Sequence, residues 1–217
     1  MTRIAFLHTA DVHVRIFDDL MADLAPDASP IHTVRAEWLA EARESGMTDD
    51  LQGRVRALLT DQAGACDAVL CTCSTLGPVV DDMAVSHPTV VRIDRPMMER
   101  AVSHDGALLL AYCLDSTLGP TLELLRTILG EQSKNSAITS VSCAAAWPFF
   151  ESGNRAGFAE TIARLVTAAV AAEVDPACVI LAQASMAPAE PLLSGPVYSS
   201  PRPAVEAVLE AANRQEN

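Results

Sequence analysis

A cysteine, a serine and a threonine follow one another at the end of a short apolar run. The run is AVLCT (68–72), and Cys73, Ser74 and Thr75 come directly after it, ahead of a Leu-Gly-Pro turn. A thiol between a strand and a helix lies near free backbone N–H groups, which lower the pKa of a cysteine towards neutral and also bind carboxylates. The hydroxyls add hydrogen-bond donors. Such a site is suited to abstracting a proton next to a carboxyl group, because the donors stabilise the enediolate-like charge that develops.

Other polar side chains also stand where apolar runs end. A second segment, CLDSTLGP (113–120), repeats the Ser-Thr-Leu-Gly-Pro ending but carries Asp115 where the first copy has Cys73. Ligands of parallel α/β sheets bind beyond the carboxyl ends of the strands. We therefore expect one cleft to be lined by the polar residues at the run ends, which are His8, Thr9, Cys73, Ser74, Thr75, Ser116, Thr117, Gln183 and Ser185.

The apolar runs alternate with helical patterns along the chain. The runs are residues 3–9, 31–34, 68–72, 89–94, 107–113, 138–144, 178–183 and 196–200. The helical patterns are 16–25, 49–64 with Thr48 or Asp49 as its cap, a short one from about residue 77, 95–104, 118–130, 154–173, 186–194 and 202–212. Strands that alternate with helices indicate parallel sheets covered on both faces, so the predicted fold class is α/β.

The alternation divides the chain into two similar halves. Residues 1–94 form the first α/β half and residues 107–200 the second, with a connecting helix over 95–106 and a C-terminal helix and tail over 201–217. We expect the halves to be pseudosymmetric, each with a mainly parallel four-stranded sheet flanked by helices, and the site to lie in the cleft between them. The third strand leads to Cys73 in the first half and to Gln183 in the second, so these two positions correspond.

Composition restricts the partners and the compartment. A net charge of −13 disfavours nucleic acid and anionic membranes as partners. No run of about 18 apolar residues occurs, so no membrane span is expected, and the start of the chain turns polar too early for a signal peptide. The six cysteines lie mostly in strand-like runs, which indicates reduced thiols and a cytoplasmic protein.

No cofactor and no metal are expected. The chain has no Gly-rich loop of the kind that binds nucleotides, and the five histidines are scattered, which argues against a metal site at Cys71 and Cys73. Because side chains alternate along a strand, we expect Cys71 to face the core. Plainer explanations stay open: the two Ser-Thr-Leu-Gly-Pro segments can be helix caps, and His8 can be a hydrogen-bonded structural histidine.

Three motifs are similar to those of the aspartate/glutamate racemase superfamily and its hydantoin racemase branch. Cys73-Ser74-Thr75 resembles the Cys-Asn-Thr or Cys-Thr-Ser motif that closes the third strand of the first half in that superfamily. LAQASM (181–186) resembles the Leu-Gly-Cys-Ala-Gly-Met region of the second half. FLHT (6–9) is similar to the first strand and its Asp-Ser turn, with His8 and Thr9 in the Asp and Ser places.

The resemblance implies a cofactor-independent isomerase of the racemase or epimerase type. It would abstract a proton next to the carboxylate of a small acid, with Cys73 as the acid/base and His8 as a candidate second base. It leaves a homodimer open. The residues that it implies as substrate ligands are Thr9, Ser74, Thr75, Ser116, Thr117, Gln183 and Ser185.

One position departs from the pattern of the family. Gln183 stands where a two-base racemase has its second cysteine, and glutamine cannot act as a general acid or base at neutral pH. Cys178 stands too early in the strand to replace it, by about 16 Å. Three interpretations stay open: another group such as His8 is the second base; the enzyme is one-sided and resembles arylmalonate decarboxylase or maleate cis–trans isomerase; or the protein only binds a small acid. AYCLD (111–115) is similar to a strand end of those one-cysteine relatives, which would make Tyr112 a carboxylate ligand.

Overall fold

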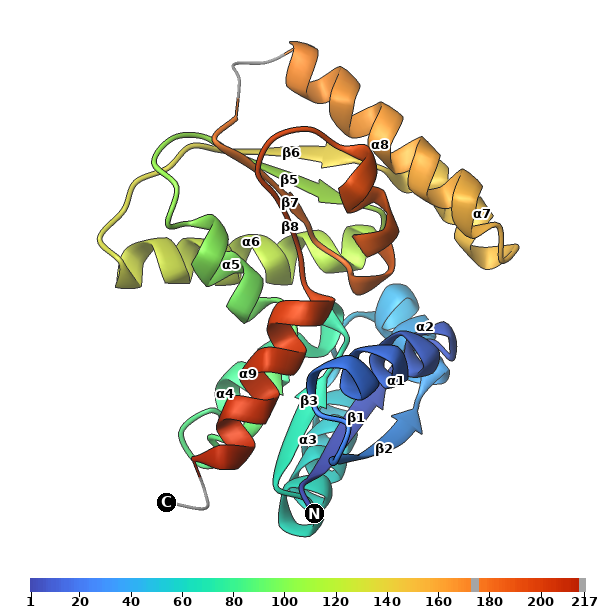
Figure 1. Ribbon diagram of the computed structural model, residues 1–217, viewed down its shortest axis with the longest axis vertical. Coiled ribbons are helices and arrows are strands. Elements are labelled where there is room, and N and C mark those ends of the chain that lie inside the picture. Colours follow the sequence, from blue (N-terminus) through green and yellow to red (C-terminus); the bar gives the residue numbers. More distant parts are fainter. Residues whose placement is uncertain (173–175, 215–217) are drawn as a thin grey trace. The chain divides into compact units, whose positions relative to one another are not determined.

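Two separate parallel sheets organise the chain, and each belongs to its own unit. The computed structural model describes residues 1–172 and 176–214. The first unit comprises residues 1–93 together with the helix that begins at Pro201, and the second comprises residues 94–200. Figure 1 shows the elements of both units, coloured along the sequence.

The first unit is built on a four-stranded parallel sheet in the order β2-β1-β3-β4. Its strands are β1 (Arg3–His8), β2 (Ser29–Val34), β3 (Ala68–Cys71) and β4 (Val90–Arg92). Its helices are α1 (Val12–Leu24), α2 (Ala36–Ser45), α3 (Asp49–Ala65), the 3-10 turn η1 (Ser74–Leu76), α4 (Gly77–Met83) and α9 (Pro201–Asn213).

Helices cover both faces of the first sheet. Leu7 and Cys71 point to the face that packs on α2, α3 and α4, so Cys71 faces the core as predicted. Phe6 points to the other face, where it meets Phe17 of α1 at 5.5 Å between ring centres. Helix α9 packs beside α1 and against β3 and β4. Because β1 is buried on both sides, it reads in the sequence as a continuous apolar run.

The second unit repeats this plan with the strand order β6-β5-β7-β8, again all parallel. Its strands are β5 (Leu108–Tyr112), β6 (Ile138–Ser142), β7 (Cys178–Leu181) and β8 (Val197–Ser199). Its helices are α5 (Arg95–Ala101), α6 (Asp115–Glu131), the 3-10 turn η2 (Ala144–Ala146), α7 (Trp147–Glu151), α8 (Arg155–Ala172) and the 3-10 helix η3 (Ala184–Leu192).

Alternate residues of the second sheet also enter two different cores. Leu110 and Ile180 pack with α5 and α6, whereas Leu109 and Val179 pack with α8. Figure 1 accordingly shows α8 on one side of this sheet and α5 and α6 on the other. The prediction of two parallel four-stranded α/β halves is therefore confirmed.

Several boundaries differ from the sequence prediction, each for a local reason. Helix α6 begins at Asp115 rather than near residue 118, which places Ser116 and Thr117 inside its first turn. The segment predicted as a helix over 186–194 is the 3-10 helix η3, because Pro188 and Pro191 remove backbone donors that an α-helix needs.

Two helices, α2 and α7, were not predicted from the sequence. Helix α2 starts after Arg35, without a side-chain cap that would mark its beginning. Helix α7 has only five residues and carries a proline in its first turn. Thr48 does cap α3, since its hydroxyl accepts a hydrogen bond from the backbone N–H of Leu51 at 3.3 Å.

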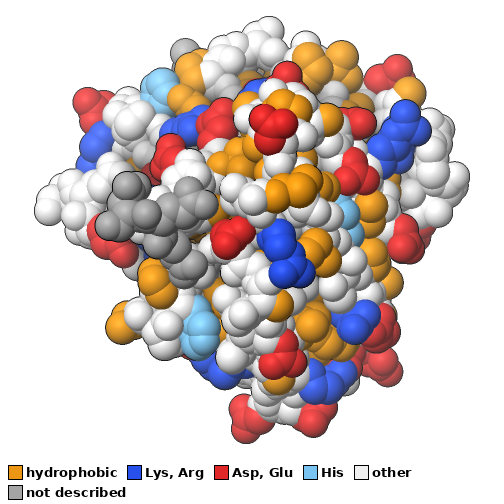
Figure 2. All heavy atoms as spheres, turned by 60° about the horizontal axis from the view of Figure 1, so that its bottom comes forward, with side chains coloured by type: hydrophobic (Ala, Val, Ile, Leu, Met, Phe, Trp, Pro, Cys, Tyr) orange, Lys and Arg blue, Asp and Glu red, His pale blue; other side chains and the backbone are white. Residues whose placement is uncertain are grey.

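Acidic side chains form no single patch on the face of the molecule that Figure 2 draws. On the side drawn in Figure 2, Asp and Glu side chains are spread among Lys and Arg. In the part of the chain that the structure describes, no helix is long and apolar enough to cross a membrane.

The two Ser-Thr-Leu-Gly-Pro segments have different packing, which can be tested at their glycines. A Cβ on Gly77 would overlap the guanidinium of Arg92, whereas no described atom lies within 4 Å of a Cβ on Gly119. The Arg92 side chain is buried and paired with Asp81, so it has little room to move.

We expect Gly77→Ala to lower the free energy of unfolding by about 1–3 kcal/mol, because overpacking forces buried neighbours to shift. Gly119→Ala is the matched control and should be neutral or stabilising by up to about 1 kcal/mol, since alanine is the better residue inside a helix. Urea unfolding of both variants measures the difference. Equal effects of the two substitutions would contradict the close approach of Arg92.

Candidate functional site

Cys73 lies at the carboxyl edge of the first sheet, between β3 and η1. It keeps an extended backbone (φ −117°, ψ 112°) and is the residue that precedes the first turn of η1. Ser74 and Thr75 form that turn, and α4 continues directly from it. Cys73, Ser74 and Thr75 are all buried, with 7% of Cys73 exposed. The thiol therefore stands between a strand end and a helix start, as the sequence indicates.

Hydrogen-bond donors surround the sulfur of Cys73. Burial raises the pKa of this thiol, and hydrogen bonds with the Thr9 hydroxyl, the Leu76 and Thr75 backbone N–H groups and the Thr75 hydroxyl act in the opposite direction. The donors expected from the sequence are present, but the expected lowering of the pKa is wrong, because the cost of burying a thiolate outweighs them. The raised pKa favours the thiol form of Cys73, with donors in place for the charge that forms when it loses its proton.

His8 is the last residue of β1 and belongs to a chain of side-chain hydrogen bonds. Its Nδ1 lies 2.9 Å from the Thr72 hydroxyl and its Nε2 lies 2.8 Å from Nδ1 of His32. Nε2 of His32 in turn lies 3.0 Å from a carboxylate oxygen of Asp18. Burial, together with His13 and His32, lowers the pKa of His8 to about 3.

The direction of these hydrogen bonds follows from Asp18. A carboxylate only accepts, so His32 donates from Nε2 and, when neutral, accepts at Nδ1 from Nε2 of His8. Nδ1 of His8 then faces the Thr72 hydroxyl as an acceptor, and the single proton of that hydroxyl is shared with the Leu7 carbonyl oxygen, at 3.1 Å. Both ring nitrogens of His8 are thus engaged, and a substrate proton could reach this ring only if one of these bonds broke. The role of His8 as second base stays a prediction.

Gln183 occupies the position in the second unit that Cys73 occupies in the first. Each lies two residues beyond the end of its third strand and directly before a 3-10 helix. The side-chain oxygen of Gln183 accepts hydrogen bonds from the backbone N–H groups of Cys113, at 2.7 Å, and Leu114, at 3.1 Å. These two residues join β5 to α6, so the loop after the first strand meets the end of the third strand in this unit as well.

The remaining predicted site residues of the second unit also lie at the carboxyl edge of its sheet. Tyr112 ends β5 and is partly buried, and Ser185 is buried in the first turn of η3. Ser116 and Thr117 lie in the first turn of α6, with Thr117 buried. In the first unit the structure thus brings together Thr9, Cys73, Ser74 and Thr75. In the second unit it places the predicted site residues at the carboxyl edge of β5 and β7. That all of them line one cleft stays a prediction.

Asp18, His32 and His13 carry no sequence signal that marks them as part of this site. His13 is buried in the first turn of α1, and neither of its ring nitrogens has a hydrogen-bond partner among the described residues. Burial lowers its pKa to about 4. His32 pairs with Phe6 across β1 and β2, which a sequence does not reveal until the strand register is known.

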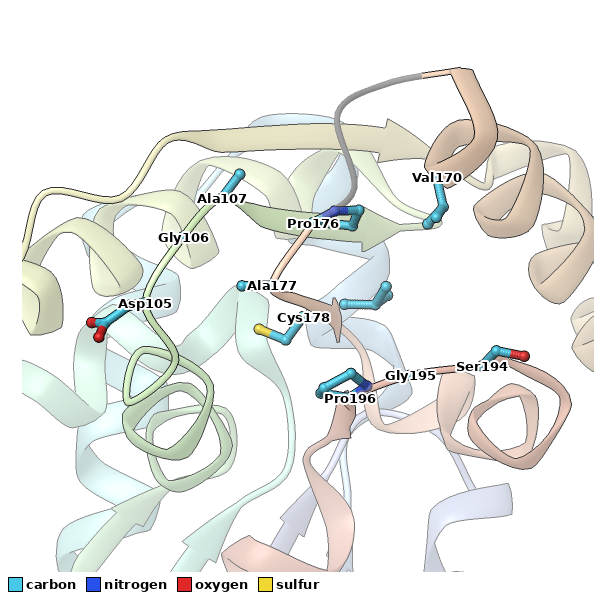
Figure 3. Close-up of a pocket in the computed structure, with 11 residues that line it drawn as sticks. Asp105, Gly106, Ala107, Val170, Pro176, Ala177, Cys178, Ser194, Gly195 and Pro196 are labelled. Carbon is cyan, nitrogen blue, oxygen red and sulfur yellow. The ribbon is translucent and has the colours of Figure 1, made fainter.

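A cavity lies at the other end of the second sheet, where its strands begin. It has a volume of about 450 Å³ and is lined by the starts of β7 and β8 and by residues 105–107. Figure 3 shows that the Asp105 carboxylate and the Ser194 hydroxyl point away from Cys178. Among the described residues that line it, this cavity brings no reactive polar groups together. Over residues 1–172 and 176–214, no group of three or more His, Cys, Asp or Glu could hold a metal ion.

Comparisons with known proteins identify solved structures that share the fold of this chain. Neither the models of protein families nor the curated proteins include a match to this chain. Among solved structures, a glutamate racemase isoform from Bacillus anthracis superimposes with a TM-score of 0.75 at 12% identity, over 99% of this chain and 82% of that one. An aspartate racemase from Picrophilus torridus gives 0.68 at 14% identity, over 98% and 95%.

A third structure, of a variant of arylmalonate decarboxylase, matches with a TM-score of 0.58 at 17% identity, over 97% of this chain and 93% of that one. At these identities the likeness shows the fold. The predicted resemblance is confirmed at that level, and the activity has to be argued from the residues of the two sheet edges.

Proposed function

On the premise that this chain has the fold of the aspartate/glutamate racemase superfamily, we propose that it is a cofactor-independent isomerase of the racemase or epimerase type. It moves a proton at the carbon next to the carboxylate of a small acid, with Cys73 as the acid/base. The observation that carries the proposal is the donor set around the Cys73 sulfur, formed by Thr9, Thr75 and the backbone N–H of Leu76.

These donors favour the thiolate and the buried setting favours the thiol, so Cys73 can both accept and return a proton. A carboxylate ligand accepts hydrogen bonds from hydroxyls and from the N–H groups at helix starts. We propose that the residues that donate these hydrogen bonds to the substrate carboxylate are Thr9, Ser74, Thr75, Tyr112, Ser116, Thr117, Gln183 and Ser185. Negative charge that moves onto the carboxylate as the α-proton leaves is stabilised by the same donors. We further propose that the protein acts in the cytoplasm on a small carboxylate, without nucleic acid or membrane partners.

A one-sided reaction is the second candidate, and Gln183 favours it. The position that corresponds to Cys73 holds an amide whose oxygen is bound by two backbone N–H groups, so it offers no proton-transfer group. In a decarboxylation, the bond between the α-carbon and one carboxylate breaks and carbon dioxide leaves. The electron pair of that bond forms an enediolate with the remaining carboxylate. The Cys73 thiol then donates its proton to the α-carbon from one face, and the thiolate is reprotonated by water.

Proton NMR in deuterium oxide distinguishes these functions over a panel of amino acids, hydantoins and malonates. Exchange of the α-proton with inversion indicates a racemase, and loss of carbon dioxide indicates a decarboxylase. Maleate is assayed separately for geometric isomerisation. Cys73→Ser should abolish whichever activity is found. If no compound is turned over, the isomerase proposal is wrong and binding of a small acid is the better description.

A further inference from the structure

We propose that Gln183 is a hydrogen-bond donor to the substrate. Its Nε2 amide group binds an oxygen of the carboxylate and of the enediolate that develops from it, where a second thiol would have transferred a proton. This inference rests on the proposed function, because it assigns a role within the same site. It makes the corresponding positions of the two units chemically different: one transfers a proton and the other stabilises charge.

The orientation of the amide is decided by its contacts. Oε1 of Gln183 receives two backbone N–H groups, from Cys113 at 2.7 Å and from Leu114 at 3.1 Å. The reversed amide would set its NH2 against these two donors, which have no acceptor to offer it. Nε2 therefore points away from the loop between β5 and α6, and no hydrogen bond of Nε2 to the described residues is found.

A second buried glutamine shows the opposite arrangement. Gln62 is exposed to the same extent, 9%, and uses Nε2 to donate to the Thr33 hydroxyl at 3.1 Å. Its Oε1 is sealed from solvent without a partner, whereas Nε2 of Gln183 is not among the sealed, unpartnered atoms of the described chain. The free donors of Gln183 are thus open to a ligand, and the free acceptor of Gln62 is not.

The contacts of Oε1 also make Nε2 a stronger donor. An amide whose oxygen accepts hydrogen bonds is polarised, and its N–H groups bind anions more strongly. The two N–H groups stand at the start of α6, a helix of 17 residues whose first turn carries partial positive charge. The environment of Gln183 therefore favours an anionic partner at Nε2.

Malonate is the probe for this role, because it carries carboxylates and its binding can be measured without turnover. In wild-type protein labelled with nitrogen-15, malonate should shift the side-chain NH2 signals of Gln183, assigned by their loss in Gln183→Met. Methionine keeps a similar volume and removes both donors. Calorimetry should show malonate binding about 10- to 100-fold more weakly to this variant, as for a hydrogen bond to a charged group. Gln62→Met is the matched control and should bind malonate like wild type.

Whether malonate binds Gln183→Met more weakly or more tightly than wild type decides between two explanations. Tighter binding by Gln183→Met would overturn the proposal, because it would mean that the amide oxygen blocks an anion site made by the Cys113 and Leu114 N–H groups. Unchanged binding, or Gln183 signals that do not move with malonate, would overturn it as well. If Gln183→Met does not fold, the wild-type signals still decide, because the Gln183 NH2 group can be assigned through its own backbone by triple-resonance NMR.

The experiment separates this inference from the proposed function. Malonate binding that depends on Gln183, without turnover of any compound, would support the donor role and refute the isomerase. Turnover that Gln183→Met retains at the wild-type kcat and KM would support the isomerase and refute the donor role.

Discussion

Gln183→Cys is expected to turn one-sided proton exchange into racemisation. The wild type has a proton-transferring group at only one of the two corresponding positions. It should therefore exchange the α-proton of one enantiomer much faster than that of the other, unless His8 supplies the opposite face. A thiol at position 183 supplies the missing group. General acid–base groups contribute about 100- to 10,000-fold, so even a poorly aligned thiol should give measurable racemisation where the wild type gives little. Exchange and inversion are followed together by NMR and polarimetry.

The controls of this prediction locate the second base. Cys73→Ser should abolish activity in both the wild type and Gln183→Cys. Fast, symmetric racemisation by the wild type that survives His8→Asn would contradict the prediction. It would show that the opposite face is served by a residue other than Gln183 or His8.

Stability is expected to fall steeply as the pH drops from 6.5 towards 4. The pKa of His13 is lowered from 6.5 to about 4 and that of His8 to about 3, in both cases first by burial. A histidine with a lowered pKa binds fewer protons folded than unfolded, so its neutral form stabilises the fold above pH 6.5 and this stabilisation is lost as the pH falls. For His13 alone the loss by pH 4 is about 3 kcal/mol.

Urea unfolding at half-unit steps of pH between 7 and 4 measures this slope. His13→Phe should remove a large part of it, and should also raise stability near pH 4, because it replaces two unpartnered buried nitrogens by an apolar ring. Leu59→Ala is the control, since Leu59 is buried in the core on the α3 side of the sheet, whose described residues include no histidine, and the change should lower stability equally at all pH values. A pH slope that His13→Phe leaves intact would contradict the assignment.

The residues at the strand ends could be found from the sequence because they depend on local patterns. Short apolar runs between helical patterns predict buried parallel strands, and the polar residues that follow them must lie at the carboxyl edge. The correspondence of Cys73 with Gln183 needed only the count of strands in each half, and the structure places both directly before a 3-10 helix. Helix α2 was not predicted, because it begins without a side-chain cap that would mark its start in the sequence.

The chemical state of these residues was decided by tertiary structure alone. The sequence indicates donors around Cys73, but only packing shows that burial outweighs them and raises the pKa of the thiol. The chain from Asp18 through His32 to His8 depends on the register of β1 with β2. The orientation of the Gln183 amide depends on a loop 70 residues away in the sequence. Burial, pKa and hydrogen-bond direction depend on neighbours from distant segments, and local patterns do not contain that information.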